Sequence, residues 1–90
     1  MDEHDKLDCN DLVRALFMGG ATEESPLTDI HPAVRGEMVR TGMNSDEDRS
    51  EVASMNAYKE GLIEGNSDSG FFVTEKGLEL LESLGIDVGE

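Results

Sequence analysis

The sequence predicts one small, mainly helical domain of about four helices, with a two-stranded β-hairpin before the last helix. Its ninety residues are enough for a single domain. Apolar residues recur at helical spacing in four segments, and glycines follow each of them. A cluster of turn-forming residues at Gly65–Gly70 separates two short apolar runs, which is typical of a hairpin.

The first helix is expected to begin with Asp8 as its N-cap and to end at Gly19–Gly20. A carboxylate at this position can accept hydrogen bonds from the free backbone N–H groups of the first turn. One face of the helix carries the predicted core residues Cys9, Leu12, Val13, Leu16 and Phe17. Residues 1–6 and 86–90 are expected to be flexible tails.

The second helix is expected to begin at Pro32 and to end at Gly42. Its predicted inward residues are Val34, Met38 and Val39. The loop before it is rich in polar residues, and Leu27 and Ile30 are its expected anchors to the core.

The third helix is expected to be capped by Asn44 or Ser45 and to end at Gly61. Its apolar stripe predicts the buried residues Val52, Met55, Tyr58 and Leu62. The hairpin strands are predicted at Leu62–Glu64 and Phe71–Val73. Thr74 then caps the fourth helix, which carries Leu78, Leu81 and Leu84 and ends at Gly85.

Acidic residues dominate the chain, which has 21 Asp and Glu against 7 Lys and Arg and a formal net charge of -14. Such self-repulsion opposes compaction in dilute buffer and is screened by concentrated salt. The composition is typical of a halophilic, archaeal cytoplasmic protein solvated by inorganic cations (K⁺ or Na⁺). An ordinary acidic interaction protein is the alternative. No apolar stretch predicts a membrane segment.

The back half of the sequence contains Tyr58-Lys-Glu-Gly-Leu-Ile-Glu-Gly and Gly70-Phe-Phe-Val-Thr-Glu-Lys-Gly-Leu. Over Ser45–Leu84 it resembles archaeal winged helix-turn-helix domains. In that family a helix ends at a glycine followed by Leu-Ile, a strand, a wing and a second strand follow, and Thr-x-x-Gly opens the closing helix. The resemblance implies a winged-helix fold with Gly65–Gly70 as the wing, where Asn66, Ser67, Asp68 and Ser69 lie.

The resemblance also implies a small, transcription-regulator-like protein that binds double-stranded DNA. The segment Asp46–Tyr58 would enter the major groove. By the same resemblance, the exposed face of this segment would carry Arg49, Ser50, Ala53 and Asn56. Arg and Asn side chains are suited to bidentate contacts with bases. Arg35, Arg40 and Lys59 are expected near phosphates, in the least acidic third of the sequence.

A second hypothesis keeps the fold but assigns it to protein–protein interaction without nucleic-acid binding. It is favoured by Asp46, Glu47 and Asp48 at the start of the third helix and by a wing without Lys or Arg. The leucine-rich last helix predicts a homodimer through Leu80 and Leu84. Whether bases such as Arg40 form a patch or pair with acids distinguishes the two hypotheses.

Enzyme, cofactor and metal functions are not predicted. Two His and one Cys offer few nucleophile–base pairs. His4 and Cys9 could contribute to a metal site, but Cys9 is better explained as a small buried residue of the first helix.

Overall fold

The computed structural model describes residues 2–42, 47–66 and 68–89. In these ranges the chain forms four α-helices, one 3₁₀ turn and a two-stranded hairpin. The elements are α1 (Glu3–Met18), α2 (Pro32–Met38), η1 (Val39–Thr41), α3 (Glu47–Lys59), β1 (Ile63–Asn66), β2 (Gly70–Val73) and α4 (Glu75–Ser83). The predicted class, mainly helical with a hairpin before the last helix, is confirmed.

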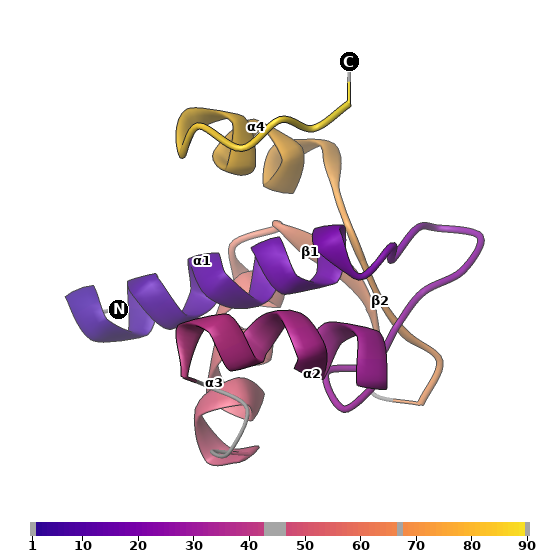
Figure 1. Cartoon of the computed structure of the whole chain (residues 1–90), viewed down its shortest axis with the longest axis horizontal. Coiled ribbons are helices and arrows are strands. Elements are labelled where there is room, and N and C mark those ends of the chain that lie inside the picture. Colours follow the sequence, from indigo (N-terminus) through magenta and orange to yellow (C-terminus); the bar gives the residue numbers. More distant parts are fainter. Residues whose placement is uncertain (1, 43–46, 67, 90) are drawn as a thin grey trace.

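Helix α1 lies in the middle of the molecule, with α4 on one side and α2 and α3 on the other (Figure 1). Its predicted inward residues Leu12, Val13 and Leu16 are fully buried, together with Cys9. Residues from every other helix and from the hairpin complete this core: Val34, Met38, Ala53, Ala57, Leu62, Ile63 and Leu81. A single core organised around one central helix therefore positions all the other elements.

Helix α1 begins earlier than predicted, at Glu3 instead of after Asp8. Asp2 is its N-cap, and the Oδ1 atom of Asp2 accepts a hydrogen bond of 2.8 Å from the backbone N–H of Asp5. Glu3 and Asp5 add negative charge where the helix dipole is positive. The prediction that residues 1–6 form a tail is therefore wrong for the described residues 3–6, which are helical.

Helix α2 begins at Pro32 as predicted, and Nδ1 of His31 caps it by accepting from the backbone N–H of Ala33 at 3.1 Å. Val34 and Met38 are buried as expected, whereas Val39 is exposed because it lies in the 3₁₀ turn that follows. Gly42 ends this turn with a left-handed φ of 79°. The caps expected at Asn44 or Ser45 lie outside the described residues, as does Asp46.

The hairpin is slightly longer than predicted, because Gly65 and Asn66 pair with Phe71 and Gly70. Leu27 joins the sheet as an isolated antiparallel bridge to Phe71, with hydrogen bonds of 2.9 and 2.8 Å in both directions. Gly70 has a φ of +105°, and a Cβ atom there would lie 2.8 Å from the Leu27 backbone. The loop before α2 is thus anchored by Leu27, while Ile30, the other expected anchor, is exposed.

Thr74 and Gly77 join the hairpin to α4. Thr74 is the N-cap as predicted: its Oγ1 accepts from the backbone N–H of Gly77 at 3.1 Å and donates to the carbonyl of Gly61 at 2.6 Å. Gly77 lies directly against the Leu62 carbonyl, so a side chain is excluded there. The Thr-x-x-Gly pattern therefore caps one helix and permits close contact with the end of another.

The segment after α4 folds back toward the core. Ile86 and Val88, in the segment 86–90 expected to be a flexible tail, are half-buried and pack against it. None of the helices in the described ranges combines the length and the apolar character needed to cross a bilayer.

We expect Gly77→Ala to lower the free energy of unfolding by about 1–3 kcal/mol, as overpacking of a tight contact does. A Cβ atom at this position would collide with the Leu62 carbonyl and lie 2.6 Å from Cγ1 of Val73. Urea denaturation at fixed KCl measures the change.

Gly36→Ala is the matched control. Gly36 is an exposed residue within α2, and a Cβ atom added there would have no neighbouring heavy atom within 4 Å. The same substitution there should stabilise the protein by up to about 1 kcal/mol. Equal destabilisation by both substitutions would contradict the steric explanation.

Candidate functional site

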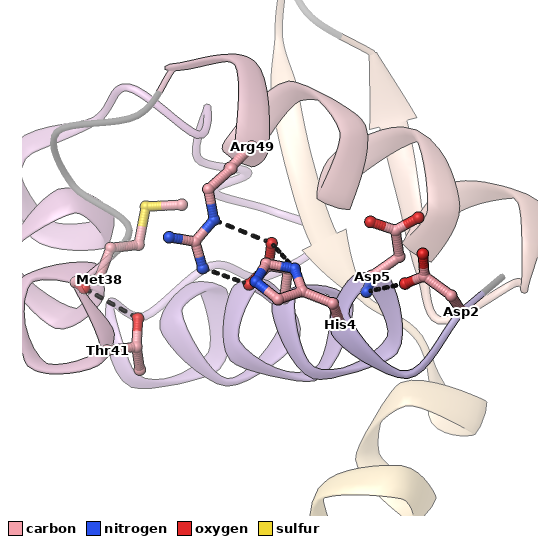
Figure 2. Close-up of polar contacts among 7 residues, drawn as sticks. Asp2, His4, Asp5, Met38, Thr41 and Arg49 are labelled. Carbon is pink, nitrogen blue, oxygen red and sulfur yellow. Dashed lines mark hydrogen bonds and ion pairs between the residues drawn. The ribbon is translucent and has the colours of Figure 1, made fainter.

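An ion pair between α1 and α3 fixes how α3 lies on the domain. The guanidinium of Arg49 donates from Nη2 to Oδ1 of Asp8 at 2.6 Å and from Nε to Oδ2 at 3.1 Å. Figure 2 shows Arg49 reaching from α3 to α1, next to His4, whose Nδ1 lies 3.6 Å from the same Oδ2 atom. Because Asp8 is buried, salt screens this bidentate pair less than a surface pair.

The carboxylates of α1 respond differently to this environment. The hydrogen bond from Arg49 lowers the pKa of Asp8 below its usual 3.8, against the opposing effect of burial, and the charges of Arg49 and His4 lower it further. Burial, and then the charge of Asp8, raises the pKa of the neighbouring Asp11. Asp8 is therefore held in its ionised form by its partner on α3.

Helix α3 turns its small residues toward the core. Its buried residues are Ser50, Ala53, Ser54 and Ala57. The hydroxyl of Ser54 donates to the carbonyl of Ser50 at 2.9 Å, which satisfies it inside the helix. Small side chains allow close packing of α3 against α1.

The prediction that Arg49, Ser50, Ala53 and Asn56 form an exposed face is wrong. Ser50 is 3% exposed and Ala53 is 1% exposed. Asn56 is half-buried, and Arg49 is engaged by Asp8. This face packs on the core, and Arg49 beside it is joined to Asp8 of α1.

The large apolar residues of α3 point outward instead. Met55 is 53% exposed and Tyr58 is 55% exposed, and Val52 is exposed as well. The predicted inward stripe is therefore wrong for these three residues and right for Leu62, which is buried after the helix has ended. Exposed apolar residues gathered on one helix indicate a binding surface more strongly than scattered ones.

An open groove with a volume of about 400 Å³ lies between the exposed face of α3 and the hairpin. Its lining residues are Asp29, Glu51, Ser54, Met55, Tyr58, Lys59, Gly65 and Phe71. Ser50 fixes one wall by donating from Oγ to Oδ2 of Asp29 at 3.2 Å. The groove therefore combines apolar side chains with two carboxylates and one ammonium group.

Two of the predicted basic residues, Arg40 and Arg49, lie beside carboxylates, as does Arg14, which was not among the predicted contacts. Arg40 Nε and Arg14 Nη2 each lie 4.0 Å from Oε2 of Glu37, and Arg49 is paired with Asp8. Arg35 is half-buried on α2. Lys59 alone among these predicted contacts lies in the groove.

The predicted wing is polar, and it is exposed at Gly65, Asn66, Asp68 and Ser69, whereas Gly70 is buried. The Oδ1 atom of Asn66 accepts hydrogen bonds from the backbone N–H groups of Asp68 at 2.9 Å and Ser69 at 2.7 Å. Ser67 lies outside the described residues. Asn66 thus shapes the turn through its own side chain.

The predicted dimer residues of α4 differ in exposure. Leu80 is half-buried and packs against the core, whereas Leu84 is 49% exposed. Leu84 is therefore available for a contact with a second copy, and Leu80 is partly used within the domain.

Sequence reasoning gave Asp8 only a capping role, placed Met55 and Tyr58 in the core and Phe71 in a strand, and predicted no role for Asp29. Two features of the sequence could have indicated the orientation of α3. Ser50, Ala53, Ser54 and Ala57 form a stripe of small residues at helical spacing. An arginine at position 49 also needs an acidic partner if it lies near a core.

Among the described residues, no group of three or more His, Cys, Asp and Glu side chains is arranged to hold a metal ion. Comparison of the chain with protein-family models, with curated proteins and with solved structures finds no match. The function of the groove is therefore inferred from its own geometry and charge.

We expect Asp8→Asn to lower the free energy of unfolding at neutral pH by about 1–3 kcal/mol, because it removes a charged hydrogen-bond acceptor from Arg49. The pKa of Asp8 is lowered on folding, so the stabilisation is present above the usual aspartate value of 3.8 and is lost as the pH falls through the folded value. The difference between variant and wild type should shrink accordingly in acid.

Urea denaturation across a pH series measures this difference. Glu79→Gln, an exposed residue of α4, is the control for the loss of one negative charge. A difference for Asp8→Asn that stays constant down to about pH 2 would show that the ion pair is not its cause.

Cys9 should be unreactive in the folded protein. Burial, and secondarily the charge of Glu60, raises the pKa of its thiol from 9.0 to about 11, and the side chain is almost fully covered. We expect alkylation at about pH 8 to be at least about 100-fold slower than in urea-unfolded protein. Rapid modification of the folded protein, measured by mass spectrometry, would contradict the burial of this face of α1.

Proposed function

We propose that this chain is a winged-helix domain that acts as a protein-interaction module and binds its partner through the face between α3 and the hairpin. The order of elements supports the fold: α2, a turn and α3 are followed by a hairpin and then α4. From α3 to α4 this is the order implied by the resemblance over Ser45–Leu84, and the first half of the chain matches by element order alone. Thr74 and Gly77, which carry part of that resemblance, form the junction between hairpin and last helix.

The observation that carries the functional part of the proposal is the exposure of Met55 and Tyr58 beside Phe71. In a DNA-binding domain of this kind, the outward face of α3 enters the major groove, next to phosphates. Here that face offers an apolar thioether, an aromatic ring and the carboxylate of Glu51. Aromatic residues and methionine are enriched at protein–protein interfaces.

The arrangement of cations supports the same choice. Non-specific DNA affinity comes mainly from Lys and Arg side chains that neutralise phosphates. Arg49 is held by Asp8, and Arg14 and Arg40 lie close to Glu37. The sequence resemblance favours DNA binding, but these acidic partners favour protein contact.

We further propose that the domain works in a salt-rich cytoplasm, where cations screen its net charge of -14. In such a medium long-range charge effects are screened, and the apolar side chains of the groove contribute binding free energy that salt does not weaken. A homodimer through the exposed Leu84, the C-cap of α4, is compatible with this proposal because Leu84 does not line the groove.

Selection from a random peptide library displayed on phage, at high KCl, tests the proposed binding face. We expect enriched peptides to bind wild type and Val39→Ser alike and to lose at least about tenfold in affinity for Tyr58→Ser. Val39 is exposed like Tyr58 but lies in η1, outside the groove.

Fluorescence anisotropy of labelled mixed-sequence duplex DNA, measured over a KCl series, tests the alternative of DNA binding. Two results together would favour DNA binding over protein interaction. The affinity of the peptides would be unchanged by Tyr58→Ser, and the affinity for duplex DNA would fall in Arg40→Ala. Circular dichroism confirms that each variant is folded.

A further inference from the structure

We propose that the groove between α3 and the hairpin receives a basic segment of a partner protein, with a bulky aliphatic side chain between Met55, Tyr58 and Phe71 and with Lys or Arg residues beside it. This inference rests on the proposed protein-interaction function and specifies the partner. Its three supports are the apolar lining, the charge around that lining and a pre-positioned carboxylate.

The apolar part of the groove is suited to side chains presented by a larger molecule. A volume of about 400 Å³ is at the lower end of the range of ~300–1,000 Å³ for small-ligand pockets. Met55 and Tyr58 form its walls and are themselves about half exposed, so the groove is open rather than enclosed. A partner that covers these walls removes water from a tyrosine, the kind of residue that dominates interface energetics.

The charge of the side chains that line the groove favours a partner segment of positive charge. Among the described residues of the groove, Lys59 carries the one positive charge against the carboxylates of Asp29 and Glu51. The whole chain has a net charge of -14, so a second copy would bring more negative charge to an acidic face. A basic segment is complementary where a second copy or DNA is not.

Asp29 is held in place before any partner arrives. Its Oδ2 accepts a hydrogen bond from Ser50, which is itself buried in α3. The loop that carries Asp29 is tied to the hairpin through the Leu27–Phe71 bridge. A pre-positioned carboxylate binds a cation with less loss of side-chain entropy than a free one.

Three short synthetic peptides test the inference: a lysine–leucine peptide, its glutamate–leucine counterpart and its lysine–serine counterpart. Each is titrated into the whole chain over a KCl series, with affinity from calorimetry and location from amide NMR shifts. We expect the lysine–leucine peptide to bind at least about tenfold more tightly than either counterpart and to shift amides of α3 and the hairpin. Tyr58→Ser should weaken it about tenfold or more, and Val39→Ser less than twofold.

Two charge reversals separate local complementarity from the overall charge. Glu51→Lys changes the groove, whereas Glu79→Lys makes the same change on the exposed face of α4. We expect Glu51→Lys to weaken the lysine–leucine peptide several-fold more than Glu79→Lys does. Equal effects of both reversals would overturn the inference, because attraction would then depend only on net charge.

Other results overturn the inference without removing the proposed function. Preferred binding of the glutamate–leucine peptide in the groove would keep a protein-binding face but reverse the partner's charge. If the lysine–serine peptide binds as tightly as the lysine–leucine peptide, the proposed aliphatic side chain in the groove contributes nothing to binding. Failure of all three peptides would overturn the inference, and the library selection would then decide separately whether the face binds protein at all.

Discussion

The ion pair between Asp8 and Arg49 is the contact on which the arrangement of the domain depends. It connects the central helix α1 to α3 through a bidentate interaction at a buried carboxylate. A helix can rotate about its axis without changing its sequence pattern, and this contact fixes one rotation. In that orientation Ser50 and Ala53 pack on α1, and Met55 and Tyr58 face the hairpin groove.

This orientation has a cost in core volume and a consequence for binding. The helix contributes alanine and serine to the core in place of methionine and tyrosine, so less apolar area is buried per turn. The apolar side chains of Met55 and Tyr58 are instead in contact with water. Exposed apolar patches of this kind are common at interaction sites, which is the basis of the proposed binding face.

Much of the fold could be predicted from local patterns. Leu12, Val13 and Leu16 share a face whichever way α1 packs, and Gly70 and Thr74 act through their own backbone and hydroxyl groups. The orientation of α3 could not be obtained this way, since its small and its large residues both recur at helical spacing. Hydrophobicity favours burying the large ones, but the deciding partner, Asp8, lies far away in the sequence. Because this long-range contact is not visible in local sequence patterns, the groove was not predicted and Arg49 was expected to be a free DNA-binding side chain.

The bridge between Leu27 and Phe71 also shapes how the chain reaches its folded state. It pairs two residues that are separated in sequence by α2, α3 and β1. Loop-closure entropy opposes such a contact until the intervening helices have collapsed, so we expect it to form late, after the helices and the hairpin itself. The bridge brings Phe71 next to the loop that carries Asp29. The groove is therefore complete only when residues from the loop before α2, from α3 and from the hairpin have come together.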